Sequence, residues 1–503
     1  MKNILEYLEE SSKLYFTKVA FTDDKREMTY GECLECSQKI GSYLLSLHKK
    51  RQPIAVLMDK SVESLSSFFG VVYSGNFYVV IDSFMPKDRI ETIFETLHPI
   101  ALISDYAHQE LAQSLHETVC FYEDMMETEI NCEELMKVRN QMIDTDPLYA
   151  LFTSGSTGVP KGAVLSHRNV INYASWYKET FNITEETQFG SQTPFYFSMS
   201  VSDVYSTVMA GATLHILPKT LFSFPIKLIE YMNEKKVNTI YWVPSALCIV
   251  ANLKVLDYLM LEYVDKILFA GEVMPTKQLN YWRKKLPNAM YANLFGPTET
   301  TDICTYYIVD REFNDDEVLP IGKACENCDV FLLDENDQEV SDDREGELCV
   351  RGSFLALGYY YNDEKTKEAF VQNPLNKAYP EMIYRTGDLV KYNERGELIY
   401  ITRKDFQIKH MGYRIELGEI EAAVNSLEKI QSCAVIFDEI KDKIVLIYTG
   451  KIDDKGIMEG VSDKIPHYMY PNVIVKVKLM PYNQNGKIDR KWLKGHYEEM
   501  GGK

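Results

Sequence analysis

The stretch of the sequence richest in reactive groups is a glycine-rich loop at residues 151–162, LFTSGSTGVPKG. Its glycines allow positive φ angles and close backbone approach, so several N–H groups can point inward around an anion. Serine and threonine hydroxyls add donors, and Lys161 adds a positive charge. The loop therefore predicts phosphate binding, and we expect a helix to follow it.

This loop is not a Walker A motif, which reads G-x-x-x-x-G-K-[S/T]. Pro160 stands before Lys161 where that motif has glycine, and Gly162 replaces the magnesium-binding hydroxyl residue. Proline has no N–H to donate to a phosphate, and it restrains Val159 to extended geometry. The alternative of a flexible linker fits poorly with the apolar residues YALF that end at the loop's start.

Four further segments place polar side chains at turns, and each is weak evidence by itself. NLFGPTETT sets a hydroxyl and Glu299 after a Gly-Pro turn, and YRTGDLVKY holds Asp388 at a turn. TRKDFQIKHMGYRIELGEIE, residues 402–421, is dense in charge and leads into a helix. NQNGKIDR carries Lys487 on a tight turn near the C-terminus. Their joint order along the chain is more specific than any one of them.

The elements that must position these groups alternate between strand and helix. RQPIAVLMD precedes the helical KSVESLSSFFGVVYSG, and the same rhythm returns from ATLHIL to a helix ending near Leu286. Repeated βα units predict parallel sheets with helices on their faces. Short strands with turn signals over residues 318–404 predict a β-rich subdomain. We therefore predict an α/β fold with a large N-terminal domain, residues 1–404, and a small α+β C-terminal domain, residues 405–503.

Length and charge narrow the class of protein. A chain of 503 residues implies two or more domains. Its formal net charge of −20 argues against a nucleic-acid partner, because phosphate backbones are bound by basic surfaces. The first residues, MKNILEYLEESSKLY, predict an amphipathic helix and not a signal peptide. No apolar run approaches the ~20 residues of a membrane span, so we expect a cytoplasmic protein.

The cysteines raise the question of a metal site. Two C-x-x-C pairs, Cys33/Cys36 and Cys325/Cys328, could contribute zinc ligands. The first pair lies in a segment with the spacing of a buried helix face, and the second lies far away beside an expected strand. Lone pairs of this kind are weak zinc signals, so we interpret the cysteines as reduced, partly buried thiols.

Together, the motifs resemble the adenylate-forming superfamily of acyl-CoA synthetases, luciferases and adenylation domains of nonribosomal peptide synthetases. The resemblance runs from MTYGEC near residue 30 to NGKIDR at 485–490. LFAGEVMP and the chain length look most like D-alanine:carrier-protein ligases and amino-acid adenylation domains. The resemblance implies a mobile C-terminal domain, an active site between the domains, and ATP with Mg²⁺. It implies that a carboxylate attacks the α-phosphorus of ATP to give acyl-AMP, and that a phosphopantetheine thiol then takes the acyl group.

The same resemblance assigns roles to individual residues. Lys487 would bridge the substrate carboxylate and the phosphate as a catalytic cation, acting with Thr153 and Lys161 of the loop. Glu299 would hold Mg²⁺, and Asp388 would accept hydrogen bonds from both ribose hydroxyls. The residues expected to bind the nucleotide are Thr153, Ser154, Gly155, Ser156, Thr157, Gly158, Lys161, Gly271, Glu272, Asn293, Leu294, Phe295, Gly296, Thr298, Asp388, Arg403 and Lys487.

Two positions depart from the pattern of this superfamily. The superfamily usually reads G-R-x-D where this chain has Thr402-Arg403-Lys404-Asp405, so the hinge glycine is missing. Asp405 can still serve as the hinge, since hinges are not restricted to small residues, and we expect Gly412 to line the path of the thiol. The larger departure is Ser198, where amino-acid-activating relatives place an aspartate that binds the α-ammonium. A neutral serine alone cannot compensate for desolvating an ammonium.

The acyl pocket is expected to be small and mostly apolar with one carboxylate. Its predicted lining is Ser198, Met199, Ser202, Ser245, Leu268, Ala270, Leu294, Asp302 and Ile303. The carboxylate lost at 198 and gained at 302 suggests a relocated ammonium site, suited to β-alanine or another β-amino acid. In the alternative interpretation, Asp302 caps a helix or pairs with a basic residue. An α-amino acid or an amine-free acid also stays open as the substrate.

We therefore predict a stand-alone adenylation enzyme, monomeric, that loads a small, preferably amino, carboxylic acid onto a separate carrier protein. Two alternatives remain. One is an acyl-CoA ligase that uses free CoA, and the other is a non-catalytic nucleotide sensor. Retention of Lys161, Glu299, Asp388 and Lys487 argues against the sensor. GPTETT and QIKHMGYRIELGEIE, in the style of adenylation domains, favour a carrier protein over CoA.

Overall fold

A computed structural model of the protein describes residues 2–154, 160–341, 343–404, 407–481 and 488–501. The chain divides into two compact units. One comprises Met1–Ser83, Leu97–Leu151 and Gly162–Lys404, and the other comprises Phe84–Thr96, Phe152–Lys161 and Asp405–Lys503. The second unit therefore combines the C-terminal segment with two short stretches from the N-terminal half, one of which contains the glycine-rich loop.

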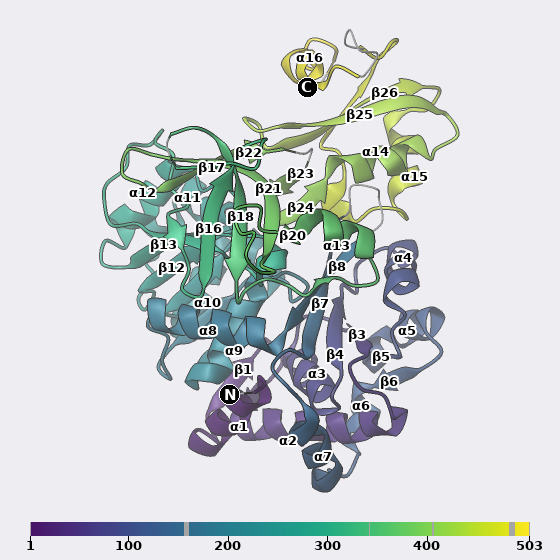
Figure 1. Ribbon diagram of the computed structural model, residues 1–503, viewed down its shortest axis with the longest axis vertical. Helices are drawn as coiled ribbons and strands as arrows, with labels where there is room; N and C mark the ends of the chain where they lie inside the picture. The colour runs from purple at the N-terminus through teal and green to yellow at the C-terminus, as the bar shows by residue number, and fades with distance from the viewer. Residues whose placement is uncertain (1, 155–159, 342, 405–406, 482–487, 502–503) are drawn as a thin grey trace. The chain divides into compact units, whose positions relative to one another are not determined.

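A large mixed sheet supports most of the candidate site in the first unit (Figure 1). Its strands, in spatial order, are β15 (Lys323–Ala324), β14 (Thr305–Ile308), β13 (Met290–Phe295), β12 (Lys266–Phe269), β11 (Thr239–Trp242), β9 (Gln188–Ser191), β10 (Thr213–Ile216), β1 (Val19–Thr22) and β2 (Glu27–Thr29). The strands from β13 through to β1 run parallel, and the outer pairs are antiparallel.

A second, mostly parallel sheet holds the strands on either side of the glycine-rich loop. Its order is β19 (Gly358–Tyr359), β8 (Lys161–Ser166), β7 (Pro147–Thr153), β4 (Phe77–Ile81), β3 (Pro53–Leu57), β5 (Ala101–Ser104) and β6 (Val119–Phe121). Every residue of β3, PIAVL, is buried. Parallel strands are covered on both faces, which is why they read as continuous apolar runs in the sequence.

Helices accompany these strands, and several begin at residues that the sequence marks clearly. A capping box of Thr29 and Glu32 starts α2, and one of Ser61 and Ser64 starts α3. Each box satisfies two N–H groups that the helix itself leaves without partners. The helices of the first unit are α1 (Leu5–Leu14), α2 (Tyr30–Leu44), α3 (Val62–Tyr73), α5 (Gln109–Leu115), α6 (Tyr122–Met126), α7 (Cys132–Gln141), α8 (His167–Thr180), α9 (Met199–Ala210), α10 (Pro225–Glu234), α11 (Pro244–Asn252), α12 (Thr276–Lys285) and α13 (Asp363–Ala369).

The helix expected after the glycine-rich loop is present as α8, but a strand lies between the loop and the helix. Strand β8 comes first, and its Ala163 and Val164 pair with Tyr359 and Gly358 of β19. Helix α8 begins only after Ser166, whose side chain forms a capping box with Asn169. The apolar run AVL pairs with β19, a strand almost two hundred residues further along the chain. No local pattern in the sequence predicts this pairing.

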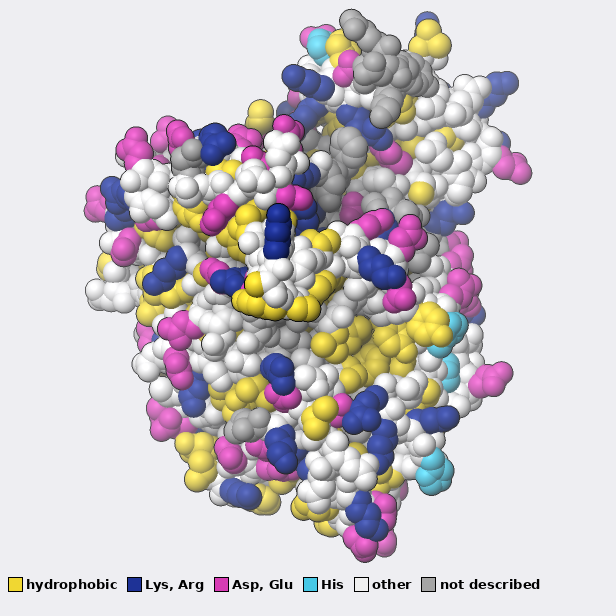
Figure 2. Space-filling view, viewed as in Figure 1, with side chains coloured by type: hydrophobic (Ala, Val, Ile, Leu, Met, Phe, Trp, Pro, Cys, Tyr) yellow, Lys and Arg dark blue, Asp and Glu magenta, His cyan; other side chains and the backbone are white. Residues whose placement is uncertain are grey.

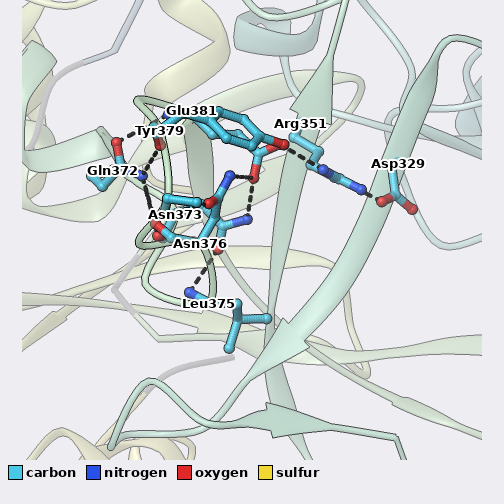
Figure 3. A network of polar contacts seen from close by, with 9 residues as sticks. Asp329, Arg351, Gln372, Asn373, Leu375, Asn376, Tyr379 and Glu381 are labelled. Carbon is cyan, nitrogen blue, oxygen red and sulfur yellow. Dashed lines mark hydrogen bonds and ion pairs between the residues drawn. The ribbon is translucent and has the colours of Figure 1, made fainter.

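The β-rich region forms an antiparallel sheet of its own. It contains β17 (Glu339–Val340), β16 (Cys328–Leu333), β18 (Gly346–Gly352), β21 (Met382–Tyr392) and β20 (Phe370–Gln372), and β22 (Leu398–Arg403) also pairs with β21. Figure 3 shows how a polar network fixes the loop between β20 and β21. Arg351 bridges Asp329 at 2.8 Å and Glu381 at 2.6 Å, while Glu381 also accepts hydrogen bonds from Asn373 and Asn376.

The second unit has a small core of its own. A hairpin of β23 (Gln407–His410) and β24 (Tyr413–Glu416) precedes a sheet of β25 (Ile430–Asp438), β26 (Lys443–Gly450) and β27 (Val473–Lys476). Helix α14 packs on β25, and apolar residues such as Ile420 and Leu446 are fully buried. The helices of this unit are α4 (Lys87–Leu97), α14 (Leu417–Asn425), α15 (Asp454–Val461) and α16 (Arg490–His496).

The architecture confirms the predicted α/β class. The N-terminal amphipathic helix is present as α1, and β3/α3 and β12/α12 fall where the sequence pattern places them. On the face shown in Figure 2, acidic side chains are interspersed with lysine and arginine. Within the described ranges, no helix combines the length and apolar character needed to cross a bilayer.

Candidate active site

The glycine-rich loop joins the ends of two adjacent strands. Thr153 closes β7 and Lys161 opens β8, and the Thr153 hydroxyl donates to the Lys161 carbonyl at 3.5 Å. The Ser154 hydroxyl donates to the carbonyl of Arg414 at 2.7 Å, within the second unit. Gly155, Ser156, Thr157 and Gly158 lie outside the described residues. The loop's two ends therefore leave the carboxyl end of one strand and enter the next, a common place for a ligand in α/β proteins.

The Gly-Pro turn after β13 carries the carboxylate expected to hold Mg²⁺. A Cβ atom at Gly296 would lie 2.4 Å from Cα of Ile303 and 2.6 Å from the carbonyl oxygen of Asp302, so only glycine lets these two backbones cross. Glu299 lies in a short 3₁₀ turn, Thr298–Thr300, and is fully buried. Its Oε1 accepts a hydrogen bond from the Tyr359 hydroxyl at 2.6 Å.

This arrangement fits a hard cation. Carboxylate oxygens are the ligands that Mg²⁺ takes from proteins, and such a carboxylate is usually oriented by a hydrogen bond from a neighbour. Tyr359 supplies that bond from β19, a strand that no sequence argument had connected with Glu299. Tyr359 is thus a candidate site residue that the sequence analysis did not single out.

The predicted ribose-binding carboxylate, Asp388, forms a buried ion pair. Asp388 of β21 and Arg403 of β22 are direct cross-strand partners, and Arg403 Nη1 lies 2.9 Å from Asp388 Oδ1. Their side chains are only 2% and 7% exposed. The Asp388 amide donates to the Thr386 hydroxyl at 3.0 Å, after Gly387 has turned the chain with φ +75°. Arg403 therefore orients the carboxylate, and the Thr386 hydroxyl fixes the backbone that carries it.

Other residues expected near the nucleotide lie at the carboxyl ends of β12 and β13. Glu272 Oε2 accepts a hydrogen bond from the Ser245 amide at 2.8 Å, and Gly271 has φ +92°. The Asn293 side chain donates to the Pro320 carbonyl at 2.8 Å. Phe295 lies 5.6 Å from the ring of Tyr400, between ring centroids. Leu294 is buried and Thr298 half-buried.

Hydroxyl groups surround the carboxylate that was predicted for the acyl pocket. Asp302, 2% exposed, accepts hydrogen bonds at Oδ2 from Tyr173 (2.9 Å), Tyr241 (3.0 Å) and Ser202 (3.2 Å). These donors come from α8, β11 and α9. Burial raises the pKa of Asp302, and the surrounding hydroxyls, that of Ser198 included, oppose the shift. In the alternative interpretation, Asp302 caps a helix or pairs with a basic residue. The contacts observed here differ from both, because the partners of the carboxylate are side-chain hydroxyls.

The other residues predicted to line that pocket differ in burial. Met199, Leu268, Ala270, Leu294 and Ile303 are buried, while Ser198 and Ser245 are half-buried. Tyr173 and Tyr241, which the sequence analysis did not single out, each donate a hydrogen bond to Asp302. They come from 129 and 61 residues away along the chain, so no local pattern could connect them.

Three further predicted residues belong with the C-terminal segment. Gly412 lies in the turn between β23 and β24 with φ +81°, next to Met411 with φ +51°. The predicted hinge residue Asp405 and the predicted catalytic Lys487 lie outside the described residues. Lys404, just before the hinge position, forms an ion pair with Glu347 at 3.0 Å.

Comparison of the sequence with known proteins shows the family of this chain. Residues 8–360 match the family model described as AMP-binding enzyme. The chain belongs to the AMP-binding enzyme family. It is 30% identical to tyrocidine synthase 1 of Brevibacillus parabrevis over 98% of this chain and 45% of that protein. It is 29% identical to the D-alanine–D-alanyl carrier protein ligase of Lacticaseibacillus casei over 98% of both chains.

The fold comparison agrees with this AMP-binding assignment. The adenylation domain AlmE of Vibrio cholerae, solved in complex with glycyl-adenosine-5′-phosphate, aligns with a TM-score of 0.85 at 20% identity over 99% of this chain and 98% of that one. The chain spans less than half the length of the first curated relatives it matches. The resemblance to the adenylate-forming superfamily predicted from sequence is thus confirmed at the level of family and fold.

Proposed function

We propose that this AMP-binding enzyme activates a small carboxylic acid with ATP and transfers the acyl group to the phosphopantetheine thiol of a separate carrier protein. The observation that carries the proposal is that both carboxylates assigned to ATP, Glu299 and Asp388, are buried and each is oriented by one side chain. Surface carboxylates without a ligand role are seldom desolvated in this way, because burying a charge is costly unless it is matched.

The first half-reaction brings two anions together, so the protein must offset their repulsion. Lys161 and the loop hydroxyls would hold the β- and γ-phosphates, and Asp388 would accept hydrogen bonds from the ribose hydroxyls. Glu299 would hold Mg²⁺, which neutralises phosphate charge when bound. Lys487 would stabilise the charge that develops as a substrate carboxylate oxygen bonds to the α-phosphorus and pyrophosphate leaves.

In the second half-reaction the thiol loses its proton, sulfur bonds to the acyl carbon, and AMP leaves with the bridging oxygen. We propose Asp405 as the pivot that exchanges Lys487 for the thiol path, with the domains meeting at residues 404 and 405. Gly412 would line that path, since its positive φ and missing side chain let a pantetheine arm pass close to the backbone.

Exchange of labelled pyrophosphate into ATP, measured with a panel of acids, tests the first step. Asp388→Asn should abolish exchange, while the exposed Asp310→Asn serves as a control of the same chemistry. Transfer is then measured to a panel of phosphopantetheinylated carrier proteins and to free CoA. ATP binding without exchange for any acid would favour a nucleotide sensor, and faster loading of CoA than of every carrier would favour an acyl-CoA ligase.

A further inference from the structure

Ser198 and Asp302 are the two positions where the predicted acyl pocket departs from the pattern of relatives, and their side chains interact with each other. Ser198 stands at the N-cap of α9 and is half-buried, while Asp302 follows the Gly296 turn and is almost completely buried. The Ser198 hydroxyl is among the groups that stabilise the Asp302 carboxylate. The nearest carboxylate to position 198 is therefore one hydrogen bond away from it, at Asp302.

Asp302 is surrounded by neutral donors. Its Oδ2 accepts hydrogen bonds from the hydroxyls of Tyr173, Tyr241 and Ser202, and the Tyr173 hydroxyl also lies 2.7 Å from that of Ser202. Within the described residues, no lysine or arginine forms an ion pair with Asp302. Hydroxyls satisfy the lone pairs of a carboxylate but leave its net charge in place.

A second buried carboxylate, Asp203, interacts with Asp302 through its charge. Asp203 is 1% exposed, and its oxygens have no partner at full hydrogen-bond geometry in the described structure, although the Ser191 hydroxyl lies near enough to stabilise the carboxylate. The side chain that offsets it is Lys60, whose Nζ donates to the carbonyl and hydroxyl of Ser191 at 2.9 and 3.0 Å. Asp203 also repels Asp302. Lys60 therefore offsets the charge of Asp203, while the groups that stabilise Asp302 are hydroxyls.

Two tyrosine hydroxyls beside these carboxylates are also unsatisfied. Tyr177 and Tyr149 are fully buried, and neither hydroxyl has a partner among the described residues. Tyr177 is close enough to feel the charges of both Asp203 and Asp302, and Tyr149 that of Asp302. Buried polar groups are normally hydrogen-bonded, so this set of donors and acceptors is complementary to a small polar ligand with a positive charge.

We propose that the acid activated by this protein carries a protonated primary amine that binds Asp302, displaced from the α-carbon as in a β-amino acid such as β-alanine. The inference rests on the proposed adenylation function and specifies its substrate. Asp302 lies one hydrogen bond, about 2.7 Å, beyond the hydroxyl of Ser198. This distance equals roughly one to two carbon–carbon bonds of ~1.5 Å each. An amine on the β-carbon instead of the α-carbon is displaced by about one such bond and can therefore reach Asp302.

The alternative substrates make different demands on the pocket. An α-amino acid would have its ammonium beside the neutral Ser198 and short of Asp302, losing the charge match. An amine-free acid would bury apolar carbon against Asp302 and leave the negative charge uncompensated, which is costly in a desolvated site. The β-amine satisfies the carboxylate and can donate to the neighbouring hydroxyl oxygens.

The experiment compares β-alanine, D- and L-alanine and propionate in pyrophosphate exchange, with wild type, Asp302→Asn and the control Asp310→Asn. We expect β-alanine to exceed propionate and both alanines at least tenfold in kcat/KM. Asp302→Asn should lower kcat/KM for β-alanine by ten- to a hundredfold and leave kcat/KM for propionate within a few-fold of wild type. The control Asp310→Asn should match wild type with every acid. A preference for propionate that Asp302→Asn leaves unchanged would overturn the inference, and so would a preference for either alanine.

Two further experiments test whether Asp302 itself binds the amine: a double variant that moves the carboxylate, and a binding assay that does not depend on exchange activity. Ser198→Asp combined with Asp302→Asn returns the carboxylate to position 198, and preference should move from β-alanine towards an α-alanine; an unchanged preference would count against Asp302 as the anchor. If no acid supports exchange, the proposed function fails, but the pocket is still judged by thermal shift. Stabilisation of wild type by β-alanine and not by propionate, lost in Asp302→Asn, would uphold the ammonium site, and no difference would refute it.

Discussion

The hydrogen bond between Tyr359 and Glu299 provides a sharp test of the proposed Mg²⁺ site. Tyr359→Phe keeps the aromatic ring, which packs beside Phe370, and removes one hydroxyl. The lost bond is 2.6 Å long, with the carboxylate fully buried and the tyrosine 5% exposed. A hydrogen bond to a charged group in such a place contributes about 1.5–3 kcal/mol.

At about 1.4 kcal/mol per factor of ten, this loss corresponds to roughly a ten- to hundredfold change if it falls entirely on the orientation of Glu299. We therefore expect Tyr359→Phe to raise the Mg²⁺ concentration needed for half-maximal pyrophosphate exchange by about that factor. Saturating Mg²⁺ should restore most of the rate, because the carboxylate itself is still present.

The assay is a Mg²⁺ titration of exchange at fixed ATP, with Tyr360→Phe as the matched control. Tyr360 is the next residue, and its ring is tilted against that of Phe77, with 5.7 Å between the ring centroids. The control should keep the wild-type Mg²⁺ dependence. An unchanged Mg²⁺ requirement in Tyr359→Phe, in a folded protein, would refute the view that this hydroxyl orients a metal ligand.

Four further outcomes are expected. Lys487→Ala should cripple adenylation and largely spare thiol transfer from preformed acyl-AMP, because the charge is needed at phosphorus; equal losses in the two half-reactions, assayed separately, would contradict this. Gly412→Ala should slow transfer more than exchange, although its φ of +81° adds a strain of about 1–2 kcal/mol; equal slowing would make Gly412 a structural turn residue. Arg403→Leu should abolish ATP binding and destabilise the fold by about 3–5 kcal/mol, since it leaves Asp388 buried without its partner; calorimetry showing normal ATP affinity would exclude the assigned role. Because burial raises the pKa of Asp302 in the folded state, its contribution to stability is present below the unfolded pKa of about 3.9 and is lost as pH rises through the higher folded pKa. Urea unfolding should then show wild type losing stability relative to Asp302→Asn as pH rises, and a pH-independent difference would oppose this assignment.

Much of this protein can be predicted from its sequence, because the relevant signals are local. The apolar run of β3 and the capping boxes of α2 and α3 act through residues within a few positions of one another, so their pattern survives in the sequence. The Gly-Pro turn locates Glu299, and the TGD turn locates Asp388, since both depend on short-range backbone geometry. Gly296 is required by a backbone crossing within its own motif.

Only the tertiary structure decided which side chains surround these groups. Tyr359 reaches Glu299 across 60 positions, and Tyr173 reaches Asp302 across 129. A long-range pairing of the same kind makes AVL part of strand β8, which the sequence analysis did not predict. Hydrogen bonds between distant segments depend on how sheets and helices pack. The residues next to a tyrosine in the sequence therefore do not predict which side chain its hydroxyl will contact. The sequence therefore determined where the carboxylates are, and the packing of α8, α9 and β11 determined that hydroxyls, and no described cation, surround Asp302.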